Sequence, residues 1–212
     1  MEAVLKEIEE SFRFIAGQVK EKPRIGIILG TGLGGLVEKI AIAQAIPYEQ
    51  IPHFPRSTVE GHEGRLIFGQ WAGKSILVMQ GRVHFYEGYP LTRVTLPVRV
   101  MRRLGVEILI ISNAAGGLNP LFVPGDVMVI SDHINFSGQN PLIGPNLETF
   151  GPRFPDMTSV YDRLLIDLAE QVALEERIRL HKGVYVGVSG PSLETPAETL
   201  SLIHISEPTR PY

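Results

Sequence analysis

A short apolar strand that runs directly into a glycine-rich loop is the feature that most constrains the fold. Residues 24–29 (Arg-Ile-Gly-Ile-Ile-Leu) contain a continuous apolar run of the kind that suits a strand buried on both faces of a sheet. Residues 30–35 follow as Gly-Thr-Gly-Leu-Gly-Gly and precede a segment that we expect to be helical. This order predicts a parallel sheet, with loop N–H groups that converge on an anion at a helix N-terminus.

The glycine loop fits more than one interpretation. Glycines at its first, third and sixth positions match the dinucleotide fingerprint, which also needs an acidic residue about 20 positions later to hold a ribose. Glu49 lies at that distance, but Pro47 and Pro52 flank it. The alternative is a tight strand-to-helix turn that needs a positive φ at a glycine. Thr31 favours a phosphate site, because its hydroxyl adds a donor for which a bare turn has no use.

Composition narrows the class of function. The 212 residues include 20 Lys and Arg against 23 Asp and Glu, which gives a net charge of −3 and indicates one soluble globular domain without a broad basic face for nucleic acid or a membrane surface. The absence of cysteine excludes disulfides, thiolate metal sites and cysteine nucleophiles. The acidic N-terminus does not resemble a signal peptide, and no apolar run reaches the roughly 18 residues of a membrane span, so we expect a cytoplasmic protein.

Strands and helices alternate along the rest of the chain, which favours an α/β fold. Apolar periodicity predicts helices over residues 4–19, over 91–104 despite Pro97, and over 161–172. Residues 135–156 carry three glycines and four prolines, which predicts a long functional or disordered loop. The expected later strands are residues 66–70 and 76–80, joined through Ala72 and Gly73, then 107–112, 127–131 and 184–188.

Polar clusters follow several of these strands, where open α/β sheets place ligands. Arg82, His84 and Tyr86 are two residues apart, so an extended segment would point all three to one side, where they would suit a phosphate dianion. Alone, His84 would be a structural histidine more often than a ligand. Residues 112–117 are small and permit close approach of a ligand to the backbone. Glu194, in the cluster at 190–195, is either functional or a solvated loop carboxylate.

Six motifs in a fixed order closely resemble the trimeric, low-molecular-weight purine nucleoside phosphorylases, from about residue 3 to Glu198. The family fold implied is α/β, with a mixed central sheet and a distorted barrel flanked by helices. The implied reaction is phosphorolysis of purine nucleosides or 2′-deoxynucleosides to the base and (deoxy)ribose 1-phosphate, in a homotrimer that uses inorganic phosphate as co-substrate and no metal or organic cofactor. The motifs are GTGLGGL, IPHFPRSTVEGHEGRL, MQGRVHFYEGYP, SNAAGGLNP, DHINFSGQNPL and GPSLETPAE.

The resemblance also implies roles for individual residues. His84 and Glu194 would be catalytic, with Glu194 on the N1–H side of the purine, which favours 6-oxopurines such as those of inosine and guanosine. Leu193 stands where relatives carry Phe, so some aromatic contact with the base is lost. Phosphate would be bound by Thr31, His62 from a candidate lid loop, Arg82, His84 and the backbone of Ala114. The nucleoside would be bound by Tyr86, Tyr185, Leu193, Glu194 and Phe154, the last from a neighbouring subunit.

The C-terminal residues depart from the family pattern. Residues 200–210, LSLIHISEPTR, resemble the translation of a sequencing-library adapter, so we expect a partial phosphorylase domain over 1–199 and a non-native tail over 200–212. Relatives continue beyond the position of Glu198 and supply a further phosphate-binding Ser, an Asn for purine N7 and a ribose-binding His. Without them we expect an incomplete sheet with an uncovered apolar face, and weak or absent activity.

Three other functions remain open on the sequence. A methylthioadenosine phosphorylase on the same fold is disfavoured by Glu194 and by the motif at 80–89. A non-catalytic fragment that binds phosphate or associates with intact subunits is favoured by the missing base-site residues. A nicotinamide oxidoreductase rests on the glycine loop alone.

Overall fold

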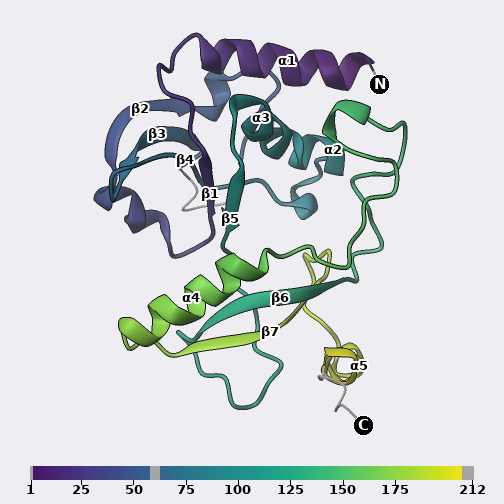
Figure 1. Ribbon diagram of the computed structural model, residues 1–212. Helices are drawn as coiled ribbons and strands as arrows, with labels where there is room; N and C mark the ends of the chain where they lie inside the picture. The colour runs from purple at the N-terminus through teal and green to yellow at the C-terminus, as the bar shows by residue number, and fades with distance from the viewer. Residues whose placement is uncertain (1, 58–62, 207–212) are drawn as a thin grey trace. The chain divides into compact units, whose positions relative to one another are not determined.

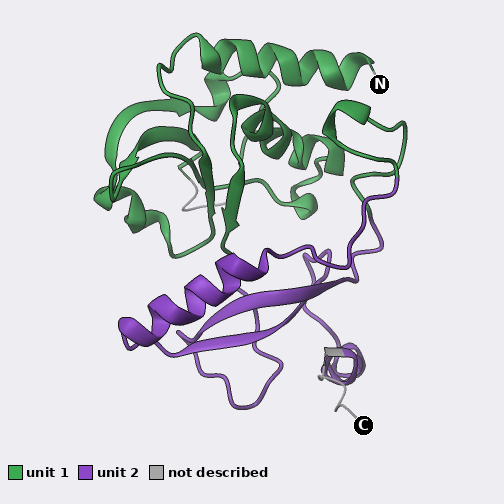
Figure 2. Ribbon diagram, in the orientation of Figure 1, with its two compact units in different colours: residues 1–114, 140–153 green, residues 115–139, 154–212 purple. Residues whose placement is uncertain are grey.

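The protein divides into two compact units, which Figure 2 shows in different colours. The structure is a computed structural model, and it describes residues 2–57 and 63–206. Unit 1 comprises Met1–Ala114 and Asn140–Arg153, and unit 2 comprises Ala115–Gln139 and Phe154–Tyr212. The long segment predicted as a loop at 135–156 is therefore shared between the units.

A five-stranded mixed sheet forms the centre of unit 1, in the order β2-β3-β4-β1-β5 (Figure 1). β1 runs parallel to both β4 and β5, whereas β2, β3 and β4 form antiparallel pairs. The predicted hairpin is present, and both of its turn residues, Ala72 and Gly73, have positive φ. The strands are β1 (Ile25–Leu29), β2 (Ala41–Pro47), β3 (Arg65–Trp71), β4 (Lys74–Gln80) and β5 (Ile108–Ile111).

The position of β2 removes the dinucleotide interpretation. In a dinucleotide-binding unit, the strand after the glycine loop and its helix lies parallel beside the first strand and carries the acidic residue at its end. Here β2 pairs antiparallel with β3 at the edge of the sheet and does not pair with β1. Glu49 lies in a short 3-10 helix, η2 (Tyr48–Gln50), beyond that edge strand.

Side chains pack on both faces of this sheet, as the continuous apolar runs predict. Consecutive residues alternate between two core clusters: Leu77 belongs to the larger cluster and Val78 to the smaller. The larger cluster is completed by α1 (Glu2–Ala16) and α3 (Leu96–Leu104), which pack against each other. The smaller cluster includes Val37 and Ile40, at and just beyond the 3-10 helix η1 (Gly34–Lys39), and Trp71 packs against it. The central strands are thus held rigidly from both sides.

The helix predicted over 91–104 is divided in two. α2 (Leu91–Val94) ends before Thr95, and α3 begins at Leu96 with Pro97 in its first turn. Proline lacks the N–H that a continuous helix would need, but the first turn of a helix leaves that donor unpaired anyway. Gly105 then ends α3 with a φ of 108°, a conformation that glycine adopts at little cost.

Unit 2 is built on a two-stranded parallel sheet of β6 (Val127–Asn135) and β7 (Leu180–Gly187). α4 (Arg163–Glu175) contacts β6, and α5 (Pro196–Ser206) contacts β7. The side chain of Asp162 caps α4 by accepting a hydrogen bond from Leu165 N at 3.1 Å. The predicted α/β class with a mixed central sheet flanked by helices is confirmed. The strands of residues 2–57 and 63–206 form one five-stranded and one two-stranded sheet.

The glycine- and proline-rich segment at 135–156 is partly anchored to a core. Leu147 and Phe150, at the 3-10 helix η4 (Glu148–Phe150), pack against the larger core cluster of unit 1. In the part of the chain that the structure describes, none of the helices has the length and apolar character needed to cross a membrane.

Candidate functional site

Three neighbouring strands of unit 1 end at one edge of the sheet. In the parallel register, Leu29 at the end of β1 lies opposite Gln80 at the end of β4, and Ile28 lies opposite Ile111 at the end of β5. The segments that follow therefore emerge side by side, and they carry three of the predicted clusters: the glycine loop, the Arg82 segment and the small residues from Ser112. Such an edge is where open α/β sheets bind ligands.

The glycine loop is a tight turn rather than the start of a long helix. Gly30 O accepts a hydrogen bond from Leu33 N at 3.2 Å, and Gly32 has a φ of 87°, which favours glycine. The backbone N–H of Gly30 donates to Ser112 Oγ at 3.0 Å. Two loop amides therefore bond within the protein, and the element that follows the loop is the six-residue 3-10 helix η1. Convergence of the loop amides on an anion stays a prediction.

The side chain of Gln80 is hydrogen-bonded to the backbone of the glycine loop. Its side chain is nearly buried, at 8% exposed, and its Oε1 accepts from Arg65 Nε at 2.6 Å. Its Nε2 lies 3.4 Å from Gly34 O, a long hydrogen bond to the backbone of the glycine loop. A buried amide that is bonded at both ends restrains the position of the loop relative to the end of β4.

The Arg82 segment is also fixed by the fold. Tyr48 is buried, and its hydroxyl donates to Gly81 O at 2.7 Å. Burial raises the pKa of Tyr48, so this hydroxyl stays protonated and remains a donor at any ordinary pH. One residue further on, Arg82 Nη1 donates to Ser112 O at 2.7 Å. The guanidinium is thereby oriented at the strand ends, where a cation suits an anionic ligand.

His84 is held by a residue that the sequence interpretation did not single out. The carboxylate of Glu87 is 2% exposed, accepts from His84 N at 2.6 Å, and lies 3.1 Å from His84 Nδ1. Because a carboxylate only accepts, this contact makes Nδ1 the donor and directs Nε2 away from Glu87. The i, i+3 spacing of a His and a Glu in residues 84–87 was the available signal.

Tyr86 lies next to His84, but the backbone conformation that brings them together differs from the one predicted. The segment is not extended throughout, because η3 (Phe85–Glu87) forms a single 3-10 turn that Gly88 closes with a φ of 90°. The rings of His84 and Tyr86 stack instead, with centroids 4.9 Å apart and planes 11° from parallel. The two side chains are adjacent as expected, but the tight turn rather than strand alternation brings them together.

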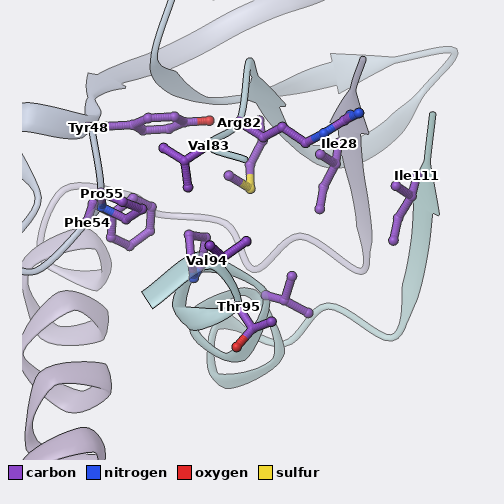
Figure 3. A pocket seen from close by; sticks show the side chains of 12 residues that line it. Ile28, Tyr48, Phe54, Pro55, Arg82, Val83, Val94, Thr95 and Ile111 are labelled. Carbon is purple, nitrogen blue, oxygen red and sulfur yellow. The ribbon is translucent and has the colours of Figure 1, made fainter. Parts of the chain in front are cut away.

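Unit 1 contains an apolar cavity of about 200 Å³ that Arg82 helps to line (Figure 3). Among the residues that the structure describes, Arg82 is the only charged one that lines it. An apolar surrounding lowers the local dielectric constant and strengthens the electrostatic interactions of the guanidinium. The cavity is lined by Ile28, Tyr48, Phe54, Pro55, Met79, Arg82, Val83, Val94, Thr95, Pro97, Val98 and Ile111.

The remaining predicted phosphate residues are placed with less support. Thr31 is exposed in the glycine turn, and Ala114 is exposed just beyond Ser112, with its carbonyl accepting from Asn113 Nδ2 at 3.0 Å. His62 lies outside the described residues. Groups of three or more His, Asp or Glu side chains placed to hold a metal ion are not found in residues 2–57 and 63–206.

The predicted nucleoside residues belong to unit 2. Tyr185 is half-buried in β7, opposite His133 of β6. Leu193 and Glu194 are exposed in the connection from β7 to α5, and Phe154 is 86% exposed. Each of these side chains is therefore presented at the surface of its own unit or close to it.

Comparisons with known proteins agree with this arrangement. Residues 24–205 match the phosphorylase superfamily. Purine nucleoside phosphorylase 1 of Bacillus subtilis is 57% identical over 191 residues, which are 90% of this chain and 70% of that protein. Purine nucleoside phosphorylase of Bos taurus is 50% identical over 198 residues, 91% of this chain and 68% of that protein.

A solved structure extends the similarity to the fold. The purine nucleoside phosphorylase of Schistosoma mansoni in complex with acetate superposes with a TM-score of 0.90 at 47% identity, covering 95% of this chain and 76% of that one. Isoform 2 from the same organism, in complex with cytosine and ribose-1-phosphate, gives 0.89 at 45% identity over 95% and 72%. The chain therefore belongs to the phosphorylase superfamily, among the purine nucleoside phosphorylases. The resemblance stated from the six motifs is confirmed.

Proposed function

We propose that the chain carries the phosphate site of an enzyme that phosphorolyses purine nucleosides of the inosine and guanosine type. Inorganic phosphate attacks C1′ of the nucleoside, the glycosidic bond breaks, and the products are the free purine and ribose 1-phosphate or its 2′-deoxy form. The observation that carries this proposal is the meeting of the glycine turn, Arg82 and Ser112 at three parallel strand ends, within a member of this family.

Phosphate binding rests on the cationic and polar groups at this edge. Arg82 supplies a delocalised charge and several donors to the anion. His84, whose Nδ1 is held by the buried side chain of Glu87, presents Nε2 as a second polar contact for the anion. Thr31 adds a hydroxyl and Ala114 a backbone N–H, and His62 would complete the group. Phosphate oriented in this way is a nucleophile already positioned for C1′.

Charge develops on both products in the transition state. The sugar acquires oxocarbenium character, which the bound phosphate dianion stabilises from below the ring. The departing purine gains electron density, and Glu194 would hold the N1–H side of a 6-oxopurine. Adenine has an unprotonated N1 whose lone pair would face this carboxylate, so Glu194 also argues against a methylthioadenosine substrate.

The sugar and base would be enclosed by Tyr86, Tyr185, Leu193 and a Phe154 contributed by a neighbouring subunit. The 86% exposure of Phe154 supports this role, because a large aromatic ring in that environment suits an intermolecular contact. We therefore propose a cytoplasmic homotrimer that uses inorganic phosphate and requires neither a metal nor an organic cofactor.

We propose further that residues 200–212 are a non-native tail on a domain of residues 1–199. The support is the adapter-like sequence. Two observations count against a boundary at residue 199: α5 (Pro196–Ser206) runs across it, and the superfamily match extends to residue 205. Reading the source DNA across the codon for Thr199 tests this: a frame that continues into an Asn- and His-containing segment supports the proposal, whereas an encoded LSLIHISEPTRPY followed by a stop refutes it. In the first case we expect the 212-residue chain to bind phosphate but to cleave inosine poorly.

Selective chemical modification of arginine tests the proposed site directly. Phosphate should protect Arg82 from a dicarbonyl reagent, while Arg102, which donates to Val106 O elsewhere in unit 1, should be modified at the same rate with and without phosphate. Protection of Arg82 by NAD but not by phosphate would overturn the proposal in favour of an oxidoreductase. Release of hypoxanthine from inosine only when phosphate is present separates an active phosphorylase from a fragment that merely binds phosphate.

A further inference from the structure

Ser112 joins the elements of the proposed phosphate site through both its side chain and its backbone. Its Oγ accepts from Gly30 N at 3.0 Å and donates to Ile28 O at 3.2 Å. Its carbonyl accepts from Arg82 Nη1 at 2.7 Å. One residue at the end of β5 is therefore bonded to the end of β1, to the glycine turn and to the guanidinium.

The contact with the glycine turn is close as well as bonded. A Cβ on Gly30 would lie 2.6 Å from Ser112 O and 2.7 Å from Asn113 Cα, distances that real Cβ atoms essentially never show. Glycine thus lets the turn rest directly on the Ser112 backbone, and the hydroxyl bond then fixes where along that backbone it rests. The position of Thr31, the next residue, follows from both contacts.

The hydroxyl and the carbonyl act on different partners. The backbone N–H of Ser112 donates to Ile28 O at 3.0 Å, so the pairing of β5 with β1 has its own bond and does not depend on the side chain. The carbonyl holds Arg82 in the same way whatever side chain is present. The hydroxyl is the side-chain group of Ser112 that bonds the glycine turn to the residue whose carbonyl holds Arg82.

We propose that Ser112 is a positioning residue that sets the distance between the glycine turn and Arg82 and thereby tunes the affinity for phosphate. This inference rests on the proposed function, and it adds to it a residue that need not touch the substrate. Removing the hydroxyl releases one side of the site while the strand pairing stays intact. Loss of the hydroxyl therefore weakens the binding of phosphate and leaves the binding of the purine unchanged.

The test compares Ser112→Ala with Ser112→Thr, which keeps a hydroxyl, and with Ser131→Ala as a matched control in unit 2. Ser131 Oγ donates to Gly183 O at 3.1 Å, so Ser131→Ala removes one similar hydrogen bond in unit 2, away from Arg82 and the glycine turn. Phosphate affinity is measured by calorimetry on the full chain, and exchange of the Gly30 amide is measured by NMR. Ser112→Cys, which keeps the size with a weaker acceptor, replaces Ser112→Ala should that variant fail to fold.

The expected result is a loss of phosphate affinity of about five- to tenfold in Ser112→Ala, the effect of one hydrogen bond, with faster exchange at Gly30. Recovery in Ser112→Thr and no change in Ser131→Ala complete the expectation. Equal phosphate affinity in Ser112→Ala and the wild type overturns the inference and leaves the proposed function standing. Failure of the wild type to bind phosphate overturns both, while the exchange at Gly30 still reports whether the hydroxyl holds the turn.

Discussion

The two units differ in how their apolar residues are buried. In unit 1, Ile67, Leu77 and Val78 are 0% exposed, because the central sheet is covered on both faces. In unit 2, the buried hydrophobic residues among those described are Ile166, Ala173 and Leu202, whereas Leu164 and Leu168 of α4 are 79% and 53% exposed. A rigid scaffold therefore lies under the phosphate residues, and the predicted nucleoside residues lie on a unit that keeps much apolar surface uncovered.

This difference matches the division of the proposed chemistry. An anion site needs donors held in fixed positions, and the strand ends of unit 1 provide them. Tyr185 is half-buried and Glu194 is exposed in unit 2, so the proposed nucleoside contacts lie on the less covered unit. The edge strand β5, with Ile110 50% and Ile111 57% exposed, is a further open apolar surface.

The largest expected effect is on the stability of unit 1. Leu77→Ala should lower its free energy of unfolding by about 2–5 kcal/mol, because a cavity opens between tightly packed layers. Leu168→Ala on the exposed side of α4 should change stability by less than about 0.5 kcal/mol. The single tryptophan, Trp71, packs on the core of unit 1, so its fluorescence during urea unfolding reports this unit. Equal effects of the two variants would show that the units do not differ as described.

The second effect concerns the anion site itself. Arg82→Ala should weaken phosphate binding about 100-fold, the usual scale for loss of an oriented charged donor in an enclosed site. Arg82→Lys should recover only part of this, since the planar fork is lost. Arg102→Ala removes an arginine-to-carbonyl bond of similar type in α3 and serves as the control. Calorimetric titration with phosphate distinguishes them, and an unchanged affinity in Arg82→Ala would remove this residue from the site.

A smaller effect separates two glycines of the same loop. Gly30→Ala should destabilise unit 1 by about 1–3 kcal/mol, because the new Cβ meets the backbone at Ser112. Gly35→Ala places its Cβ in open space and should stay within about 0.5 kcal/mol of the wild type. Urea unfolding followed at Trp71 measures both, and a neutral Gly30→Ala would contradict the close approach of the two strand ends.

The smallest expected effect is on the stability of unit 2 at acid pH. The pKa of Asp126 is lowered, first by the hydrogen bond from the backbone N–H of Val123 and then by that from the His181 side chain. Because the folded pKa lies below that of the unfolded chain, this carboxylate stabilises unit 2 at pH values above the unfolded pKa of about 3.9, and the contribution is lost as pH falls through the folded pKa.

NMR signals of Val123 and His181 should therefore report local loosening in acid, while Trp71 fluorescence of unit 1 stays constant over the same pH range. In Asp126→Asn this acid-dependent step should disappear, because no carboxylate remains to be protonated. A step that persists in Asp126→Asn would assign the acid sensitivity to another group.

Most strands and helices were predictable because their signals are local. Apolar runs identified β1, β3, β4 and β5, and the hairpin turn followed from Ala72 and Gly73. β2 was missed, since residues 41–47 have neither a continuous apolar run nor clear alternation and pair only as an edge strand. The helix over 91–104 was predicted without its break, although Pro97 marked the position.

The sequence predicted residues for the site, and the structure shows how some of them are held. Arg82 and His84 were found from the strand end and from the family motif. Glu87, Gln80 and Tyr48 were not, because each acts through a hydrogen bond whose partner is identified only when the chain is folded. The partnership of Glu87 and His84 was within reach, as the two residues are three apart.

The amino-acid sequence by itself determined the family, the strands β1, β3, β4 and β5, and the identity of the proposed phosphate ligands, because these depend on local pattern and motif. Tertiary structure alone decided that β2 lies beside β3, that the Gly30 amide bonds to the Ser112 hydroxyl, and that the core is concentrated in unit 1. These outcomes depend on contacts between residues far apart in the chain, here Gly30 and Ser112, which are 82 positions apart.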